Sequence, residues 1–283
     1  MRYIALLLAL VIGVAFCGLT GGFSGLDWLW MLPAGFVGAL LVLAVLLFLL
    51  LWISCAFVNT DKPQTKDSPY YRWLTNLMTD AVLWLLRMRV HSKGLENTPK
   101  SGRFLLVCNH LGDLDPVLLF NQFRKSQIAF ISKRENDQKP FVGEVMHKTM
   151  CQLINRENDR EALKTIINCI KLIQEDVVSI GVFPEGYTSM DGLLHPFRSG
   201  VFKIAQKAKV PVVVCTVQNT NKVFRNIKSL KPTDIHLHLL AVIPPEEFAG
   251  ITAVELANRV HAMMAEDLGP DLVLQQGENH AED

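Results

Sequence analysis

A histidine and an aspartate stand five residues apart in the segment 109–115, directly after the apolar run FLLVC. An imidazole exchanges protons near neutral pH, and a carboxylate hydrogen-bonded to it fixes its tautomer and raises its basicity. If the chain turns back at Gly112, the carboxylate of Asp115 reaches the ring of His110. The spacing therefore favours a general base. The alternative is that Asp115 is the N-cap of the next helix and His110 is an ordinary loop residue.

A second polar segment, FPEGYTS at residues 183–189, follows the apolar run SIGVF. Gly186 permits a tight turn and a close approach of the backbone to a ligand. Glu185 can accept hydrogen bonds from a polyol or hold a neighbouring loop. A P-E-G turn is common by itself, so its significance depends on the segment 109–115 that accompanies it.

Together with further blocks, these segments resemble the glycerolipid acyltransferase family, typified by 1-acyl-glycerol-3-phosphate (lysophosphatidic acid) acyltransferase. The family's N-H-x4-D block is similar to residues 109–115, and its F-P-E-G-T-R-S block to residues 183–189. Its K-x-E-x4-P-x-x-G block is matched by Lys133, Glu135, Pro140 and Gly143. Weaker similarities follow at residues 152–156, 192–202 and 210–215. The blocks keep the family's order over about residues 105–217.

The resemblance implies transfer of a fatty acyl group from acyl-CoA or acyl carrier protein to a hydroxyl of lysophosphatidic acid or a related lysophospholipid. His110 and Asp115 are implied as the catalytic pair, and no metal or other cofactor is expected. The implied substrate-binding residues are Asn109, Lys133, Arg156, Glu185, Gly186 and Arg198. Two positions depart from the family pattern: Tyr187-Thr188 replaces Thr-Arg, and Asn155 replaces Asp. The first departure removes a phosphate-binding arginine, which bears on the head group that is accepted.

Other functions are compatible with parts of the sequence. Residues 113–117 (DLDPV) fit the D-x-D-x-[TV] pattern of aspartyl-phosphate phosphohydrolases. A non-catalytic membrane scaffold with a degenerate acyltransferase domain is a further alternative. His236 and His238 alternate along one strand, but a third ligand for a metal is not evident. A net charge of +1 gives no electrostatic drive for binding nucleic acid, so no nucleic-acid partner is expected.

The elements that must position these residues alternate between strands and helices from residue 89 onward. Strands are predicted at 104–109, 128–132, 151–155, 178–183, 210–217 and 235–243, and helices at 116–124, 140–149, 160–174, 199–209 and 252–268. This alternation predicts an α/β fold with a mixed sheet flanked by helices. Ligands of such sheets bind where strands end and loops begin, which is where both polar segments fall.

Residues 1–60 hold only two charged side chains, Arg2 and Asp27. The apolar runs 4–25 and 31–58 each reach the roughly 20 residues that a helix needs to cross a bilayer. They predict a two-helix transmembrane hairpin in the cell membrane. The connection between the runs has no Lys or Arg, whereas Arg2 and the basic residues after position 60 flank the pair. The positive-inside rule then places the catalytic domain in the cytoplasm.

The predicted domain organisation has four parts. Residues 1–60 form the hairpin, and 61–90 form a linker with an amphipathic helix (70–88) whose aromatic residues suit a membrane interface. Residues 91–270 form the acyltransferase domain, and 271–283 a loose tail. The six cysteines are scattered without a C-x-x-C pair, which is typical of a reducing compartment.

Overall fold

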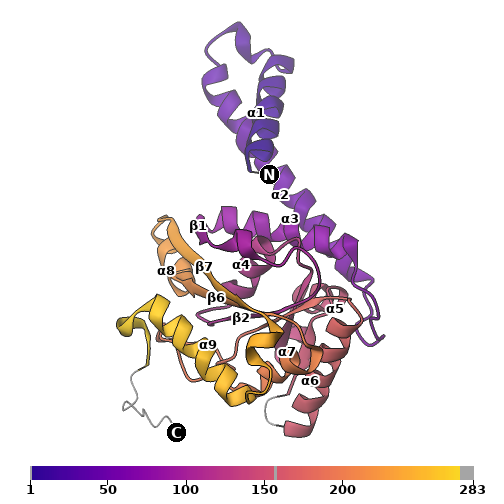
Figure 1. Cartoon of the computed structure of the whole chain (residues 1–283). Helices are drawn as coiled ribbons and strands as arrows, with labels where there is room; N and C mark the ends of the chain where they lie inside the picture. Colours follow the sequence, from indigo (N-terminus) through magenta and orange to yellow (C-terminus); the bar gives the residue numbers. More distant parts are fainter. Residues whose placement is uncertain (1, 156–157, 275–283) are drawn as a thin grey trace. The chain divides into compact units, whose positions relative to one another are not determined.

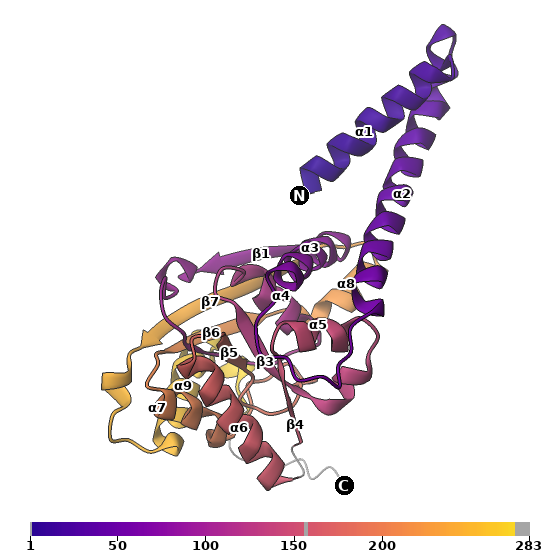
Figure 2. The ribbon, with the colours of Figure 1, turned by 90° about the vertical axis from the view of Figure 1, so that its right-hand side faces the viewer.

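The computed structural model describes residues 2–155 and 158–274, and the chain divides into two compact units, Met1–Asn59 and Thr60–Asp283. The first unit is a pair of apolar helices, α1 (Arg2–Leu19) and α2 (Trp28–Ala56), joined by a short connection (Figure 2). The helices approach closely where both carry glycine. A Cβ added to Gly35 would lie only 3.1 Å from the Cα of Gly13.

The lengths of these two helices support one of the two predicted membrane spans and leave the other a prediction. Among the described residues, α2 is the one helix that is long and apolar enough to cross a membrane. The first apolar run was expected to stay helical to about residue 25, but α1 ends at Leu19. The small residues after it turn instead, with Gly21 in the left-handed region at φ 73°. At 1.5 Å per residue, the 18 residues of α1 reach about 27 Å.

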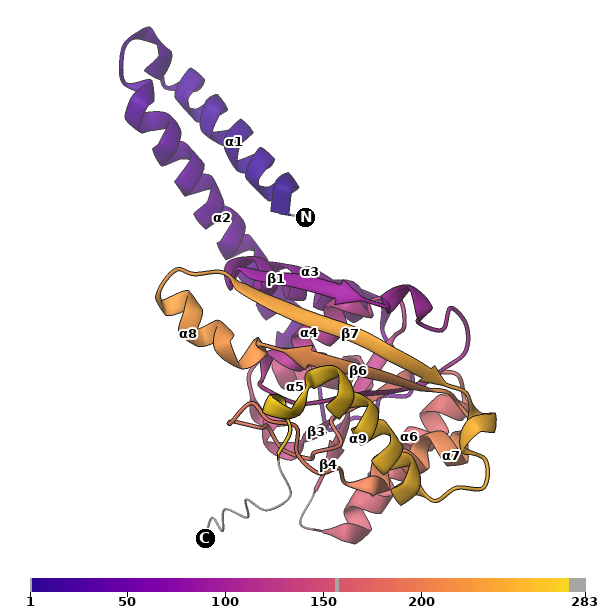
Figure 3. The same ribbon diagram turned by 60° about the vertical axis from the view of Figure 1, so that its left-hand side comes forward.

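The second unit is built on a seven-stranded sheet, and Figure 3 shows its long strand β7 between β1 and β6. The strand order is β1-β7-β6-β2-β5-β3-β4. Strand β7 is antiparallel to β6 and parallel to β1, and all other neighbours are parallel. The strands are β1 (Met88–Lys93), β2 (Leu105–Cys108), β3 (Ile128–Lys133), β4 (Gln152–Ile154), β5 (Ser179–Val182), β6 (Val212–Gln218) and β7 (Thr233–Ile243). The predicted mixed sheet flanked by helices is confirmed.

Helices cover both faces of this sheet, as Figures 1 and 2 show. On one face, α6, α7 and α9 bury Ile166, Ile204 and Val260 in a core with β2, β5 and β6. On the other face, α3 and α4 bury Leu83 and Leu118 in a second core. The helices of this unit are α3 (Pro69–Leu85), α4 (Leu114–Gln122), α5 (Val142–Lys148), α6 (Asp159–Gln174), α7 (Lys203–Ala208), α8 (Val223–Lys228) and α9 (Ala253–Leu268).

Two elements of this unit were not predicted, and one of them crosses a predicted domain boundary. Strand β1 lies at the sheet edge, and of its six residues only Met88 is buried. A largely exposed edge strand has no apolar run by which the sequence could indicate it. Helix α8 has only six residues, which is too short for a clear helical pattern. Because β1 pairs with β7, the sheet extends across the predicted boundary between residues 90 and 91. Helix α3 and β1 belong to the same compact unit as the rest of the sheet.

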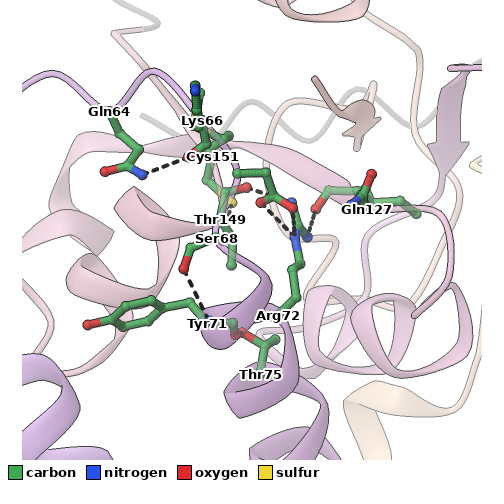
Figure 4. A network of polar contacts seen from close by, with 12 residues as sticks. Gln64, Lys66, Ser68, Tyr71, Arg72, Thr75, Gln127, Thr149 and Cys151 are labelled. Carbon is green, nitrogen blue, oxygen red and sulfur yellow. Dashed lines mark hydrogen bonds and ion pairs between the residues drawn. The ribbon is translucent and has the colours of Figure 1, made fainter. Parts of the chain in front are cut away.

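Helix α3 is attached to this unit through the largely buried side chain of Arg72, shown in Figure 4. The guanidinium donates to both carboxylate oxygens of Asp67, at 2.9 and 3.0 Å. It also donates to the carbonyl oxygens of Ile128 and Thr149, which belong to β3 and to the end of α5. A guanidinium offers five donors in a planar fork, so one side chain can join three segments that lie far apart in the sequence.

The predicted loose tail, 271–283, is only partly covered by the described residues. Its beginning is ordered, because Leu194 pairs with the segment around Val273. The amide of Leu194 donates to the carbonyl of Leu272 at 2.8 Å, and the amide of Leu274 donates to the carbonyl of Leu194 at 3.1 Å. The rest of the predicted tail, 275–283, lies outside the described residues.

Candidate active site

Three neighbouring strands of the sheet end at one edge: β2 at Cys108, β5 at Val182 and β6 at Gln218. They are parallel, and β2 lies between the other two. The polar segments 109–115 and 183–189, which follow β2 and β5, therefore leave the sheet side by side. This edge is where ligands bind in open α/β sheets.

The carboxylate of Asp115 folds back from the first turn of α4 onto the end of β2. Its Oδ2 accepts hydrogen bonds from the backbone N–H groups of Leu111 at 2.6 Å and Gly112 at 2.8 Å. The same oxygen lies 2.9 Å from Nδ1 of His110, and Oδ1 accepts a hydrogen bond from the hydroxyl of Thr220. Asp115 therefore binds the loop before the helix, and the alternative that it serves as the N-cap is wrong.

The ring of His110 is held on several sides and stays partly accessible. It stacks on Phe183, with 4.2 Å between the ring centroids and an interplanar angle of 20°. Because the carboxylate of Asp115 is surrounded by donors, Nδ1 carries the proton that is shared with it, and Nε2 keeps a lone pair. The hydroxyl of Thr188 lies 3.1 Å from that Nε2. The arrangement is that of a general base with an oriented ring.

A second carboxylate, Glu185, is also buried, and its donors come from three places. Its Oε1 accepts from the backbone N–H of His110 at 2.7 Å, and its Oε2 accepts from the hydroxyl of Ser189 and from the backbone N–H of His195 at 3.1 Å. Burial raises the pKa of the Glu185 carboxyl above its usual value, and these hydrogen bonds oppose the rise. Glu185 thus joins the loops after β2 and β5, which is one of the two roles considered from the sequence. The substrate-binding role that the resemblance implies stays a prediction.

Asn109 has a similar positioning geometry. Its side-chain nitrogen donates to the carbonyl oxygen of Val217 at 2.9 Å, and its oxygen accepts from the N–H of the same residue at 2.8 Å. The amide is buried and extends the pairing between β2 and β6 by one residue. The prediction that Asn109 binds substrate gains no support from this arrangement.

Gly186 and Arg198 lie together beside a cavity of about 230 Å³. Gly186 has φ 84°, which favours glycine, and a Cβ there would lie 2.8 Å from Nε of Arg198, so a larger residue would require the Arg198 side chain to shift. The amide of Arg198 donates to the carbonyl of Pro184 at 2.8 Å, which fixes the turn. Phe183 also lines the cavity, and its other walls are mostly apolar: Ile131, Ile154, Ile166, Val182 and Val201.

The remaining predicted residues are not drawn into this site by any described contact. Lys133 is exposed at the end of β3, the strand beyond β5. Arg156 lies outside the described residues. The aspartate required by the phosphohydrolase alternative, Asp113, is 80% exposed and lies 4.0 Å from Lys139. It is five residues beyond the end of β2, so the geometry does not favour that alternative.

The histidines considered as a metal pair have other partners. His236 stacks on His91, and Nδ1 of His238 lies 3.1 Å from a carboxylate oxygen of Asp267. In the part of the chain that the structure describes, no group of three or more His, Cys, Asp or Glu side chains is arranged to hold a metal ion.

With this geometry established, comparison with known proteins gives a consistent result. Residues 89–218 match the family model described as Acyltransferase. The segment includes His110, Asp115 and Glu185 with the strands that hold them. A 1-acyl-sn-glycerol-3-phosphate acyltransferase of Borreliella burgdorferi is 29% identical over 162 residues, which cover 57% of this chain and 64% of the relative. Residues 89–218 are thus similar to the acyltransferase family.

Further relatives carry the same name. Proteins of Chlamydomonas reinhardtii and Salmonella typhimurium are 32% and 27% identical over 64% and 65% of this chain. These alignments cover 53% and 74% of the relatives, so the chain spans about half to three quarters of their length. The crystal structure of the 1-acyl-sn-glycerophosphate (LPA) acyltransferase of Thermotoga maritima shares the fold. Its TM-score is 0.59 at 20% identity, over 95% of this chain and 96% of that chain.

Some residues that shape the candidate site were not predicted from the sequence. Thr220, which donates to Asp115, follows β6 and lies 105 residues away in the chain. No pattern in the sequence connects the two residues. Ser189 is different, because it ends the FPEGYTS segment that had already been singled out. Its contact with Glu185 could have been anticipated from that segment.

The arrangement around Glu185 generates a prediction about stability. Glu185→Ala leaves buried donors of His110, Ser189 and His195 without an acceptor. Each such group costs about 1–3 kcal/mol, so we expect the free energy of unfolding to fall by at least that amount in a denaturant titration. The control is Glu266→Ala, at an exposed position of α9, which should change stability by less than about 0.5 kcal/mol. Equal stability of the two variants would contradict the role given to Glu185.

Proposed function

We propose that this protein is an acyltransferase, which moves a fatty acyl group from a thioester, carried by coenzyme A or acyl carrier protein, to a hydroxyl of lysophosphatidic acid or a related lysophospholipid. The observation that carries the proposal is the pair of His110 and Asp115 at the end of β2, with Nδ1 of the ring 2.9 Å from the carboxylate. Relatives named as 1-acyl-sn-glycerol-3-phosphate acyltransferases support this substrate class.

In the proposed mechanism His110 is the general base. With Nδ1–H donated to Asp115, the lone pair of Nε2 takes the proton of the acceptor hydroxyl as its oxygen attacks the thioester carbonyl. Asp115 stabilises the imidazolium that forms. The new C–O bond remains, the C–S bond breaks, and the imidazolium returns its proton to the departing thiolate. A thioester is already an activated acyl donor, so the attack is direct and proceeds without an acyl-enzyme.

The cavity beside Phe183 fits the amphipathic character of these substrates. Its walls are mostly apolar, and Arg198 is the one cation among the described residues that line it. Thr188 stands where the family's block has an arginine, and its hydroxyl is directed at His110, so this position offers no cation to a phosphate. We infer that Arg198 binds the acceptor phosphate, because a guanidinium matches phosphate with two parallel hydrogen bonds.

The first functional prediction concerns His110. His110→Ala should reduce acyl transfer by about 10²–10⁴-fold while the protein stays folded, because it removes the general base. The assay is thiol release from a thioester, run with a panel of lysophospholipids and with both donor types. The control is His91→Ala, at an exposed position of β1, which should keep the wild-type rate. A folded His110→Ala protein with substantial activity would refute the assignment. A wild-type protein that is inactive on every lysophospholipid would favour the scaffold alternative.

The second functional prediction concerns the head group. Arg198→Ala should raise the Michaelis constant for lysophosphatidic acid roughly ten- to hundredfold, since a charge-assisted hydrogen bond contributes about 1.5–3 kcal/mol. The effect on the Michaelis constant for the thioester should be smaller. Lys207→Ala, which removes an exposed cation of α7, is the matched control. If Arg198→Ala leaves acceptor use unchanged, the phosphate is not bound at this cavity.

We further propose that the N-terminal unit holds the enzyme at the cell membrane as a two-helix hairpin. Support comes from the length and composition of α2 and from large apolar side chains that face outward on both helices, including Leu7 and Val45. Helix α3 of the second unit also exposes aromatic rings, at Tyr70, Trp73 and Trp84. Such rings are favoured at a bilayer interface.

The topology generates the third functional prediction. The connection between the hairpin helices has no Lys or Arg, so the positive-inside rule places residues 60–283 in the cytoplasm. Protease added to intact cells should therefore leave this segment whole. The same protease should digest it after the cells are opened. Cleavage between residues 60 and 283 in intact cells would contradict the orientation.

A further inference from the structure

The hydroxyl of Thr188 lies where, in the proposed mechanism, the hydroxyl of the acyl acceptor would bind to His110. Its hydroxyl lies 3.1 Å from Nε2 of His110, the nitrogen that faces away from Asp115. Because Nδ1 carries the proton shared with Asp115, Nε2 is an acceptor and the Thr188 hydroxyl donates to it. In this state the lone pair that would deprotonate a substrate is already hydrogen-bonded to the protein.

The segment that carries Thr188 is fixed on both sides. Before it, Gly186 makes a turn with φ 84°, and its amide donates to the carbonyl of Phe183 at 3.1 Å. After it, the amide of Ser189 donates to the carbonyl of His110 at 2.8 Å, and the Ser189 hydroxyl donates to buried Glu185. The backbone is thus tied to the loop that bears His110. The hydrogen bond to Nε2, in contrast, depends on a single side-chain hydroxyl, which leaves Nε2 by rotation about χ1.

This arrangement matters because water competes with the lipid acceptor. A water molecule hydrogen-bonded to Nε2 would be activated in the same way as a lipid hydroxyl. Its oxygen would attack the thioester carbonyl, the C–S bond would break, and the proton would pass through His110 to the thiolate. The products would be a free fatty acid and a free thiol, so the activated acyl group would be lost.

We propose that Thr188 is a positioning residue that protects the thioester from hydrolysis. It acts through His110 by holding Nε2 until the hydroxyl of a lysophospholipid displaces it. The proposal rests on the proposed acyl transfer and adds a specificity for lipid hydroxyls over water. A net hydrogen bond contributes about 0.5–1.5 kcal/mol, so its loss should increase the fraction of unoccupied Nε2 roughly two- to tenfold.

The test uses the full chain in detergent micelles with palmitoyl-CoA. Two rates are measured: thiol release without any acceptor, and product formation with saturating lysophosphatidic acid. Thr188→Ala should raise acceptor-independent thiol release roughly two- to tenfold relative to transfer. Thr188→Ser, which keeps the hydroxyl, should restore the wild-type ratio. Adding His110→Ala to Thr188→Ala should abolish the extra hydrolysis, because the effect passes through Nε2.

The outcomes separate this proposal from the proposed function. If the wild type transfers acyl groups in a His110-dependent way but Thr188→Ala leaves the ratio of hydrolysis to transfer unchanged, the proposal about Thr188 is overturned and the function stands. A parallel fall of both rates, or a Thr188→Ser variant that behaves like Thr188→Ala, also overturns it, since either result indicates a structural role. If the wild type shows no His110-dependent transfer, both proposals fail.

Discussion

The carboxylate of Asp115 is completely buried, and a buried charge is stable only where hydrogen-bond donors surround it. Its donors come from three places: the backbone of the loop after β2, the ring of His110, and the hydroxyl of Thr220 after β6. To satisfy this single group, the loop must turn back at Gly112 and the end of β6 must lie beside β2. The orientation of the His110 ring is therefore a consequence of satisfying a buried charge.

Glu185, which follows the neighbouring strand β5, is likewise a buried carboxylate that needs hydrogen-bond donors around it. It holds the backbone N–H of His110, while Asp115 holds the side chain of the same residue. Asn109 adds the connection to β6 through Val217. His110 is thus fixed by the ends of three parallel strands. Nε2 is the part of its ring that remains for chemistry, since Nδ1 is paired with Asp115 and one ring face is covered by Phe183. Such preorganisation makes general-base catalysis efficient, because the ring does not have to be oriented during the reaction.

The sequence predicted the parts of this structure that depend on local patterns. Apolar runs located the strands β2 to β7, and the five-residue spacing of His110 and Asp115 predicted their contact. Edge strand β1 was missed because its side chains are largely exposed and polar. The length of α1 was overestimated because an apolar composition does not reveal a turn at Gly21.

Contacts between distant segments could not be predicted in the same way. Thr220 reaches Asp115 only because the strand order places β6 beside β2, and a single sequence does not contain that order. The family resemblance implied that Glu185 and Asn109 bind substrate, and for Glu185 the sequence also allowed that it holds a neighbouring loop. Their side chains instead meet unpaired backbone groups at the strand ends, which become visible only when the sheet is assembled. Position in the fold decides whether such a polar group faces substrate or protein.

The most direct test of this account is a double-mutant cycle between His110 and Asp115, measured as the rate of acyl transfer to lysophosphatidic acid. Asp115→Asn removes the charge that orients and stabilises the ring, and His110→Ala removes the ring itself. If the two residues act as one unit, each single variant is strongly impaired and the double variant is no slower than His110→Ala alone. Losses that multiply in the double variant, or an Asp115→Asn protein with the wild-type rate, would contradict the claim that Asp115 works through His110.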